Sequence, residues 1–375
     1  MAGYGGPYPG SFIPMLERAI VAGRDRGWTT EAVFTPVARN RPWRTELEEK
    51  GISLRFAPSN SGSELRSWVQ KLADESKGVT IFHSHFTAFD TAVALVARTR
   101  PRTVAIWHVH TVLPPGIAGW ARNSAKFVSH GRLVQAIVCV SDDLAAAVRR
   151  RGAPRRRVVS VLNGIDLDRF PMRSAETEAS GKLALDVPTD RPVLLHLGWD
   201  WRQKGGDLFV ECVVRLHEMG LEATALTVGA PAEVRREIER LPLRDSVRIL
   251  EARDQIQELY AAADVFLAPS RGEGAPFAVL EALATGTPVV ASDIPAHRLP
   301  QPPPTLQVTA AEPDALARAV RSTLRRSPAE AREQASLGRA WVEENMSIER
   351  WVRQILGIYD QALSSIGARP DTAGT

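Results

Sequence analysis

The sequence has few cysteines and lacks a long apolar run. Cys139 and Cys212 are the only cysteines among 375 residues, and both fall in apolar segments that read as a strand and a helix. They predict buried free thiols and a reducing, cytoplasmic compartment. No stretch approaches the roughly eighteen consecutive apolar residues of a membrane span. The N-terminus shows no basic region followed by an apolar one, so no secretory signal is predicted.

A strong excess of one charge is also absent. The formal net charge is +4, which suits anionic ligands such as nucleotide diphosphates and is too small to indicate nucleic acid as a partner. The length predicts about two domains, and 44% hydrophobic residues supply their cores. Two successive runs of alternating strand and helix patterns predict an α/β protein with two doubly wound halves.

The most informative stretch runs from residue 264 to 292. An apolar run at 264–268 predicts a buried strand, and residues 269–274 form a loop. Pro276 fits the first turn of a helix that Gly286 ends, and a second apolar run at 288–291 follows. This order predicts a strand–loop–helix–strand unit of a parallel sheet.

Two carboxylates give this unit its chemistry. Glu273 lies in the loop at the carboxyl end of the strand, where ligands of open α/β sheets bind, and Glu281 follows on the helix. Carboxylates accept hydrogen bonds from sugar and ribose hydroxyls. The N–H groups of Gly274 and Ala275 suit phosphate or hydroxyl oxygens. Two surface glutamates on an ordinary βαβ unit remain the alternative.

Residues 270–293 resemble the donor-site signature of retaining glycosyltransferases of family 4. The resemblance implies the GT-B fold, with two Rossmann-like doubly wound domains facing a central cleft and a C-terminal helix crossing back. It implies transfer of a hexose-type sugar from a nucleotide-diphosphate sugar to a hydroxyl of a saccharide, lipid or natural product. In that family the first glutamate, here Glu273, holds sugar hydroxyls and the second, Glu281, holds the ribose. Gly274, Ala275 and Pro276 would complete this part of the donor site, with no cofactor and no metal.

A second match lies between the strand at 192–198 and the helix at 207–219. A lysine beside glycines at a strand-to-helix turn is placed to meet phosphate, which fits Lys204. The resemblance assigns Lys204 to the donor diphosphate. Family members usually carry an arginine where Trp199 stands, and Arg202 is the candidate substitute. An exposed lysine at a helix start is the alternative for Lys204.

The first ten residues form a glycine-rich loop. Gly5 and Gly6 match the family's loop beside the donor phosphates, and Gly10 with Ser11 at the start of a helix is the other possible match. A frayed N-terminus is the alternative without a ligand. No apolar strand precedes this loop, although a central strand normally feeds it. We therefore expect a chain that is truncated, or whose start is misassigned, before Met1.

Histidines recur at the ends of two predicted strands, at 79–85 and 104–110. Each strand ends in His-x-His, and no Cys or carboxylate accompanies them, which argues against a metal site. Structural histidines are a second interpretation. The resemblance implies that His108 lies beside the reacting sugar, with His110 as the register alternative. It places His85 on the acceptor side.

Three further segments carry predictions. The arginine-rich run at 149–157 is either a solvated helix end or a contact with a polyanion or with anionic lipid, the latter as a peripheral contact at the inner face of a membrane. Asn163-Gly164 predicts a turn, since both residues tolerate positive φ. The polar run at 173–182 predicts a linker. The loop at 111–116, with Trp107 and Trp120, either shapes the acceptor pocket or merely packs.

The predicted organisation has three parts. Residues 1–170 form the acceptor-binding domain, residues 171–345 the donor-binding domain, and residues 346–375 the crossing helix and a disordered tail. A catalytically inactive nucleotide-sugar-binding partner is the alternative from another functional class. Another GT-B enzyme, such as a nucleotide-sugar epimerase or a phosphorylase, is the alternative within enzymes.

Overall fold

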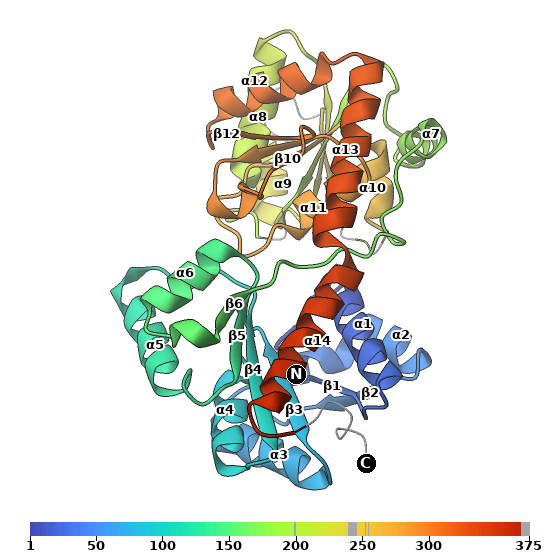
Figure 1. Cartoon of the computed structure of the whole chain (residues 1–375). Helices are drawn as coiled ribbons and strands as arrows, with labels where there is room; N and C mark the ends of the chain where they lie inside the picture. Colours follow the sequence, from blue (N-terminus) through green and yellow to red (C-terminus); the bar gives the residue numbers. More distant parts are fainter. Residues whose placement is uncertain (199, 239–245, 252, 254, 369–375) are drawn as a thin grey trace. The chain divides into compact units, whose positions relative to one another are not determined.

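The computed structural model consists of two compact α/β units (Figure 1). Unit 1 comprises Met1–Gly164 and Ile348–Thr375, and unit 2 comprises Ile165–Ser347. The structure describes residues 1–198, 200–238, 246–251, 253 and 255–368. Within these residues no helix is long and apolar enough to cross a bilayer.

Unit 2 is built on one six-stranded parallel sheet with the order β12-β11-β10-β7-β8-β9. Its strands are β7 (Val193–Leu197), β8 (Thr224–Val228), β9 (Val247–Leu250), β10 (Val265–Ala268), β11 (Val289–Ser292) and β12 (Leu306–Thr309). The chain starts at the centre with β7, moves outward to β9, and returns to the other side of β7 with β10. The strand order therefore reverses between β7 and β10, which is where doubly wound sheets bind ligands.

Helices cover both faces of this sheet, which is why β7, β8, β10 and β11 are buried along their whole length (Figure 1). The helices are α7 (Ala175–Ala184), α8 (Gly206–Glu218), α9 (Ala232–Ile238), α10 (Gln257–Ala262), α11 (Phe277–Ala284), α12 (Pro313–Leu324) and α13 (Pro328–Met346). α8 packs against α12. α10 and α11 contact each other, and α10 also packs against α7 and α11 against α13. A short 3-10 turn at Pro295–His297 follows β11.

The prediction of a linker at 173–182 is wrong, because most of this segment belongs to α7. Ser174 and Thr177 form a reciprocal capping box at its start, with Thr177 N donating to Ser174 Oγ at 3.2 Å. Further along, Lys182 Nζ lies 2.8 Å from Glu178 Oε1 and 3.2 Å from Asp264 Oδ2. Capping and ion pairing thus hold a helix whose polar composition reads as a loop.

Unit 1 contains a four-stranded parallel sheet and a separate parallel pair. The four strands are β3 (Thr80–His85), β4 (Thr103–Val109), β5 (Ala136–Cys139) and β6 (Val158–Ser160), and the pair is β1 (Glu31–Phe34) with β2 (Ser53–Phe56). Ala2 bridges to Phe34 of β1 and to His85 of β3. The place of a central strand between β1 and β3 is thus occupied by this bridging residue and its immediate neighbours.

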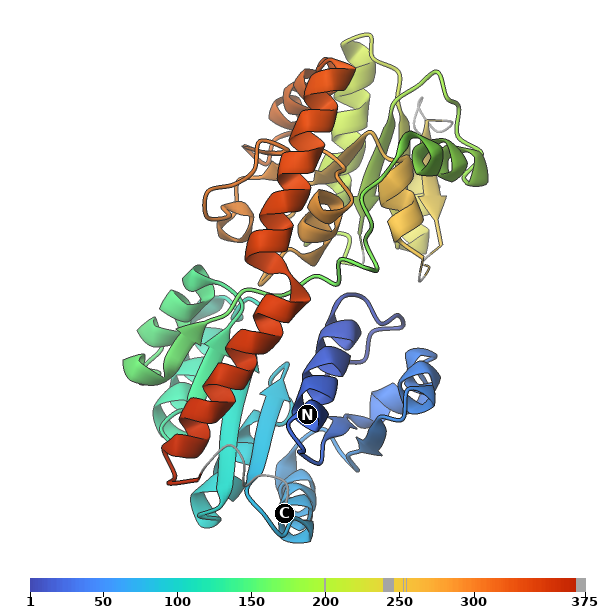
Figure 2. The ribbon, with the colours of Figure 1, turned by 45° about the vertical axis from the view of Figure 1, so that its right-hand side comes forward.

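Seven helices belong to unit 1 in the described chain. They are α1 (Phe12–Asp25), α2 (Trp43–Glu49), α3 (Gly62–Glu75), α4 (Asp90–Thr99), α5 (Gly116–Ser129), α6 (Asp142–Arg150) and α14 (Ile348–Ser364). α14 runs alongside α1 (Figure 2), and Arg18 and Arg26 pair with Glu349 and Asp360 at 2.9 and 2.8 Å. The last helix of the chain is therefore an integral layer of unit 1.

Two local predictions have different outcomes here. The predicted turn at Asn163-Gly164 is wrong, since neither residue lies in a turn or has a positive φ. Gly164 instead permits close packing, because a Cβ there would lie 2.7 Å from the Cα of Ile348. Both cysteines are buried and free, as predicted. Burial raises the pKa of each thiol to about 12, so both are inert at neutral pH.

Candidate functional site

The reversal of strand order in unit 2 brings Lys204 and Glu273 together. Lys204 lies in the loop after β7, and Glu273 lies in the loop after the neighbouring strand β10. Lys204 Nζ is 3.0 Å from Glu273 Oε2. Parallel strands place these two loops at the same edge of the sheet. A cation and a carboxylate that are far apart in sequence thus share one site at the predicted ligand-binding edge.

Glu273 is a buried carboxylate surrounded by donors. Its side chain is only 5% exposed, Ser270 Oγ donates to Oε1 at 2.5 Å, and His297 Nε2 lies 3.6 Å from Oε1. Burial by itself would raise the pKa of Glu273. The charge of Lys204, the contact with His297 and the Ser270 hydrogen bond outweigh burial and lower the pKa to about 2. Glu273 is therefore fixed as an anion that can accept hydrogen bonds from a ligand.

His297 also contributes to this site, although no sequence motif singles it out. It lies in the 3-10 turn after β11 and is fully buried, and its Nδ1 donates to Ser292 O at 2.8 Å. That bond leaves Nε2 directed at Glu273 Oε1. The turn lies more than twenty residues from Glu273 in the sequence. The two meet because β11, which precedes the turn, pairs with β10, which precedes Glu273.

The two loops are also cross-linked around the Lys204–Glu273 pair. Arg271 forms two hydrogen bonds with the carboxylate of Asp207, at 2.7 and 2.6 Å, and Gln203 Nε2 donates to Gly272 O at 2.9 Å. Gly205 has a φ of +71°, and a Cβ there would lie 2.1 Å from Pro269 O. The backbones can approach this closely only because glycine stands at 205.

The other predicted donor residues of the first loop have different environments. The side chain of Arg202 is exposed, and its carbonyl accepts a hydrogen bond from Arg271 at 2.8 Å. Trp199, where the family usually has an arginine, lies outside the described residues. Arg202 is thus free to move toward a ligand, while its backbone is held in place.

Glu281 lies on α11 and is buried. Its Oε2 accepts a hydrogen bond from the hydroxyl of Tyr260 on α10 at 2.9 Å. Pro276 is the N-cap residue of α11, one position before the first turn in which it was expected. The described residues offer no hydrogen-bond acceptor to the backbone N–H groups of Gly274 and Ala275. These N–H groups are therefore available just before the helix, where anions bind.

In unit 1, four histidines gather on one face of β3 and β4. Residues i and i+2 share a face of a strand, and His85 pairs in register with His108. His83 and His85 therefore lie beside His108 and His110. His85 Nδ1 lies 2.9 Å from His110 Nε2, and His108 Nδ1 lies 3.2 Å from His83 Nε2. The sequence shows two separate His-x-His pairs, and it does not predict that the two pairs form one cluster.

The cluster is buried and uncharged. Burial, followed by repulsion from the neighbouring imidazoles and the N-terminal amine, holds the pKa of His83 and His85 well below the usual value. Burial lowers the pKa of His110 to about 3. On the outer side, His83 Nδ1 lies 2.7 Å from the hydroxyl of Tyr359 on α14. The imidazoles are thus neutral hydrogen-bonding groups at neutral pH.

Three members of the cluster also have the spacing of a candidate metal site. One ring nitrogen from each of His83, His85 and His108 lies within 4.8 Å of the others. Neutral imidazole is a common metal ligand. Four of the eight ring nitrogens of the four histidines pair within the cluster, and His83 Nδ1 pairs with Tyr359. His108 Nε2 and His110 Nδ1 have no partner among the described residues. The spacing alone would allow a metal, whereas the hydrogen bonds among the imidazoles favour a hydrogen-bonded core.

The other predicted residues of unit 1 are packed or partly covered. Gly5 and Gly6 are half-buried in a loop that folds around Tyr4, and Gly6 O accepts a hydrogen bond from Trp43 Nε1 at 3.0 Å. Trp107 is fully buried, as its packing interpretation predicts. Trp120 is 52% exposed.

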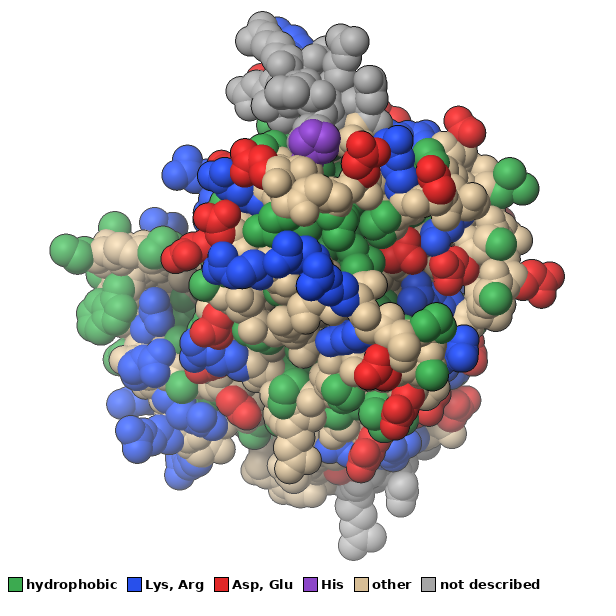
Figure 3. Space-filling view, turned by 90° about the horizontal axis from the view of Figure 1, so that it is seen from above, with side chains coloured by type: hydrophobic (Ala, Val, Ile, Leu, Met, Phe, Trp, Pro, Cys, Tyr) green, Lys and Arg blue, Asp and Glu red, His purple; other side chains and the backbone are tan. Residues whose placement is uncertain are grey.

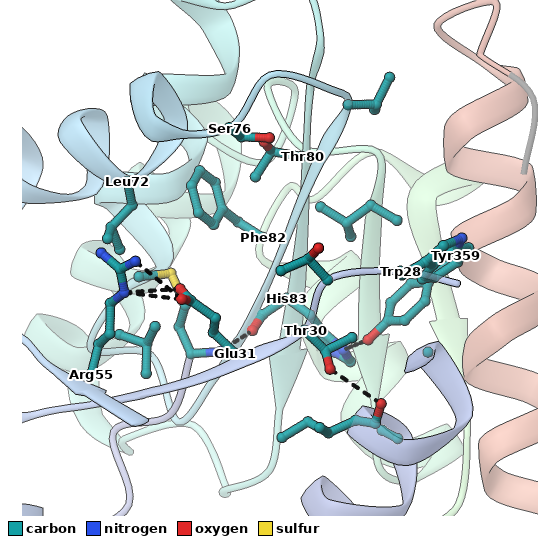
Figure 4. Close-up of a pocket in the computed structure, with 18 of the residues that line it drawn as sticks. Trp28, Thr30, Glu31, Arg55, Leu72, Ser76, Thr80, Phe82, His83 and Tyr359 are labelled. Atoms are coloured by element: carbon teal, nitrogen blue, oxygen red, sulfur yellow. Dashed lines mark hydrogen bonds and ion pairs between the residues drawn. The ribbon is translucent and has the colours of Figure 1, made fainter. Parts of the chain in front are cut away.

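A groove of about 490 Å³ lies in unit 1 between β1 and β3 (Figure 4). At one end Arg55 pairs with Glu31 at 3.0 Å, and at the other His83 faces Tyr359. Among the predicted site residues, His85 alone lines this groove. The groove is thus distinct from the Lys204–Glu273 pair, which belongs to unit 2.

Two family models match the chain, one in each half. The model described as "Glycosyltransferase Family 4" matches residues 22–169, and "Glycosyl transferases group 1" matches residues 191–326. The two matches therefore cover most of both units.

Curated relatives match at moderate identity. The lipopolysaccharide core biosynthesis mannosyltransferase LpsB of Rhizobium meliloti is 34% identical over 145 residues, which are 36% of this chain and 40% of LpsB. The putative glycosyltransferase EpsF of Bacillus subtilis is 27% identical over 269 residues, which are 68% of this chain and 69% of EpsF. The match thus spans less than half of LpsB.

A solved structure resembles the whole chain. The crystal structure of HepE from Anabaena in complex with UDP has a TM-score of 0.79 at 20% identity, covering 97% of this chain and 98% of HepE. At this identity the likeness concerns the fold, which is the GT-B fold predicted from the sequence.

Proposed function

Because this chain belongs to glycosyltransferase family 4, we propose that it moves a hexose-type sugar from a nucleotide-diphosphate sugar to a hydroxyl acceptor, with retention of configuration. The observation that carries this proposal is the 3.0 Å contact between Lys204 Nζ and Glu273 Oε2 at the switch point of the unit 2 sheet. A cation for the diphosphate and an anion for sugar hydroxyls stand side by side there.

Lys204 would act on the leaving group. As the glycosidic bond breaks, the diphosphate gathers negative charge, which fixed positive groups stabilise. The N-terminus of α8, which begins at Gly206, adds backbone N–H groups and the positive end of the helix dipole. Arg202 is exposed and would supply the second cation that the family usually places at residue 199.

Glu273 would orient the sugar, and Glu281 the ribose. Glu273 is ionised and rigidly held, so it accepts hydrogen bonds without rearrangement. Glu281 presents one oxygen to Tyr260, which fixes its rotamer. The N–H groups of Gly274 and Ala275, next to Pro276, would meet donor oxygens.

Unit 1 would contribute the acceptor side and the histidine near the reacting sugar. His108 is the first candidate for this histidine, and His110, one residue beyond the end of β4, is the alternative. His85 would face the acceptor, and the loop with Gly5 and Gly6 would approach the donor phosphates. All of these imidazoles are neutral, so they would act by hydrogen bonding and would carry no charge.

Thermal stabilisation by nucleotides tests the proposal. UDP, GDP, ADP and dTDP are compared, each alone and as its common sugar conjugates, because a ligand that binds only the folded protein raises its melting temperature. We expect one nucleotide to stabilise the protein, and its sugar conjugate to be hydrolysed or transferred.

Glu273→Ala distinguishes an enzyme from an inactive binding partner. We expect turnover to vanish in a folded Glu273→Ala protein. Binding without any turnover in the unmodified protein, across all donors and a range of hydroxyl acceptors, would instead favour the inactive partner.

A further inference from the structure

Helix α5 has apolar residues on its exposed side as well as on its buried side. Its inner side buries Gly119 and Phe127. On its outer side Ile117 is 90% exposed, Trp120 52% and Val128 48%. An α-helix rotates by about 100° per residue, so these outer side chains lie within one arc of roughly 100° around the helix axis. This outer stripe consists of Ile117, Trp120, Ala121 and Val128, with the half-buried Ser124 between them.

The stripe continues into the loop before the helix. Val112 is 51% exposed, and Pro114 and Pro115 are exposed as well. In the described part of the chain nine large hydrophobic side chains are exposed, and four of them lie between residues 112 and 128. Single exposed hydrophobic residues need no explanation, but a contiguous group indicates an interaction surface.

The arginine-rich run at 149–157 divides into two groups. Arg149 donates to Val158 O at 2.8 Å, Arg151 to Ala147 O at 3.3 Å, and Arg157 to the carbonyls of Arg132 and Val134. These three hold the backbone of the turn. The other three, Arg150, Arg155 and Arg156, point into solvent. They are free to contact an external anion.

The apolar stripe and the exposed arginines adjoin each other. A Cβ on Gly152, in the middle of the arginine run, would lie 2.5 Å from Val128 Cγ2 at the end of the stripe. Figure 3 shows hydrophobic and basic side chains gathered at its left edge, where α5 and α6 lie. The acidic residues of α6, Asp142 and Asp143, occupy its first turn. They are about 12 Å away along the helix from the basic end.

We propose that this apolar–basic face, formed by Val112, Ile117, Trp120, Val128, Arg150, Arg155 and Arg156, docks the protein on an anionic lipid bilayer. Tryptophan and aliphatic side chains enter the interface between headgroups and acyl chains. The adjoining arginines meet lipid phosphates, which accounts for the charge as well as the apolar area. This inference concerns localisation and does not depend on the proposed sugar transfer.

Sedimentation of the full chain with lipid vesicles tests the inference. Vesicles of phosphatidylcholine are compared with vesicles that also contain phosphatidylglycerol. We expect binding to the anionic vesicles alone, and weaker binding as salt rises, because salt screens the arginines. Ile117→Glu with Trp120→Glu, and separately Arg155→Gln with Arg156→Gln, should each lower the partition coefficient about tenfold or more.

Two control variants match these changes elsewhere on the surface. Leu183→Glu replaces a leucine that is 82% exposed on α7, and Arg318→Gln replaces an exposed arginine on α12. Both controls should bind vesicles like the unmodified protein. The proposal is overturned if the unmodified protein stays in the supernatant, if it binds neutral vesicles equally well, or if the variants on the face bind unchanged. A dimer that Ile117→Glu dissociates, without vesicle binding, would assign the face to self-association instead.

Discussion

Lys204 Nζ lies 3.0 Å from Glu273 Oε2, although sixty-nine residues separate them in the chain. The contact neutralises a nearly buried carboxylate with a cation that stays 23% exposed. A diphosphate reaching this edge of the sheet would meet a lysine already held in position. The same lysine would then be shared between Glu273 and the ligand.

Replacing Lys204 should weaken nucleotide binding. In Lys204→Met, a diphosphate loses a charge-assisted hydrogen bond worth about 1.5–3 kcal/mol, which corresponds to about tenfold to a hundredfold in Kd. Isothermal titration with the nucleotide that stabilises the protein measures this loss. Lys71→Met, on the exposed side of α3, is the control and should leave Kd unchanged. An unchanged Kd in Lys204→Met would remove Lys204 from the donor site.

Gly205 should tolerate alanine much less well than Gly220. Both residues have a positive φ, of +71° and +74°, so both variants bear the same backbone strain of about 1 kcal/mol. A Cβ at Gly205 also meets Pro269 O at 2.1 Å, whereas a Cβ at Gly220 meets nothing within 4 Å. We expect Gly205→Ala to cost at least about 2 kcal/mol more than Gly220→Ala in urea unfolding.

This pair of variants also tests the approach of the two loops. Equal destabilisation of Gly205→Ala and Gly220→Ala would show that the loop at 200–205 does not lie as close to Pro269 as the structure has it.

The histidine cluster should make the protein labile to acid. The pKa of each buried imidazole is lower in the folded chain than the ordinary 6.5, so below pH 6.5 the unfolded chain binds more protons. The stabilisation of the folded state by the neutral imidazoles is complete above pH 6.5. It is lost as the pH falls, by about 1.4 kcal/mol per histidine and pH unit.

Urea unfolding at pH 7.5 and 5.5 measures this loss. His110→Gln removes one buried titrating group, so its stability should fall less between the two pH values than that of the unmodified protein. His217→Gln, at an exposed position of α8, should behave like the unmodified protein. If His110→Gln shows the full pH dependence, His110 is not a buried neutral imidazole.

Removal of metal should have no effect on activity or melting temperature. Ring nitrogens of the cluster already pair with each other and with the Tyr359 hydroxyl, and in the proposed function Lys204 would serve as the cation for the diphosphate. Dialysis against EDTA, followed by a melting curve and a transfer assay, tests this. A drop in melting temperature that Zn²⁺ reverses, and that His85→Gln abolishes, would instead identify His83, His85 and His108 as a metal site.

The fold class and the residue types of the candidate donor site could be predicted from the order of the amino acids. Apolar runs bounded by glycine and proline indicate the strands, because parallel strands that are covered on both faces are mostly apolar. The loop–helix pattern around Glu273 and the glycine-flanked Lys204 are equally local signals. Where the local signal is polar, as at 173–182, the prediction fails, because capping and ion pairs that form α7 do not appear in hydrophobic periodicity.

Which residues come into contact depends on the tertiary structure. The neighbouring positions of β7 and β10 bring Lys204 to Glu273, and that of β11 brings His297. The register of β3 with β4 assembles the four histidines. Strand order and register depend on packing of the whole sheet, and no short stretch of sequence encodes them. The charge and burial of each site residue follow from those contacts, and so do the pKa shifts that set its chemistry.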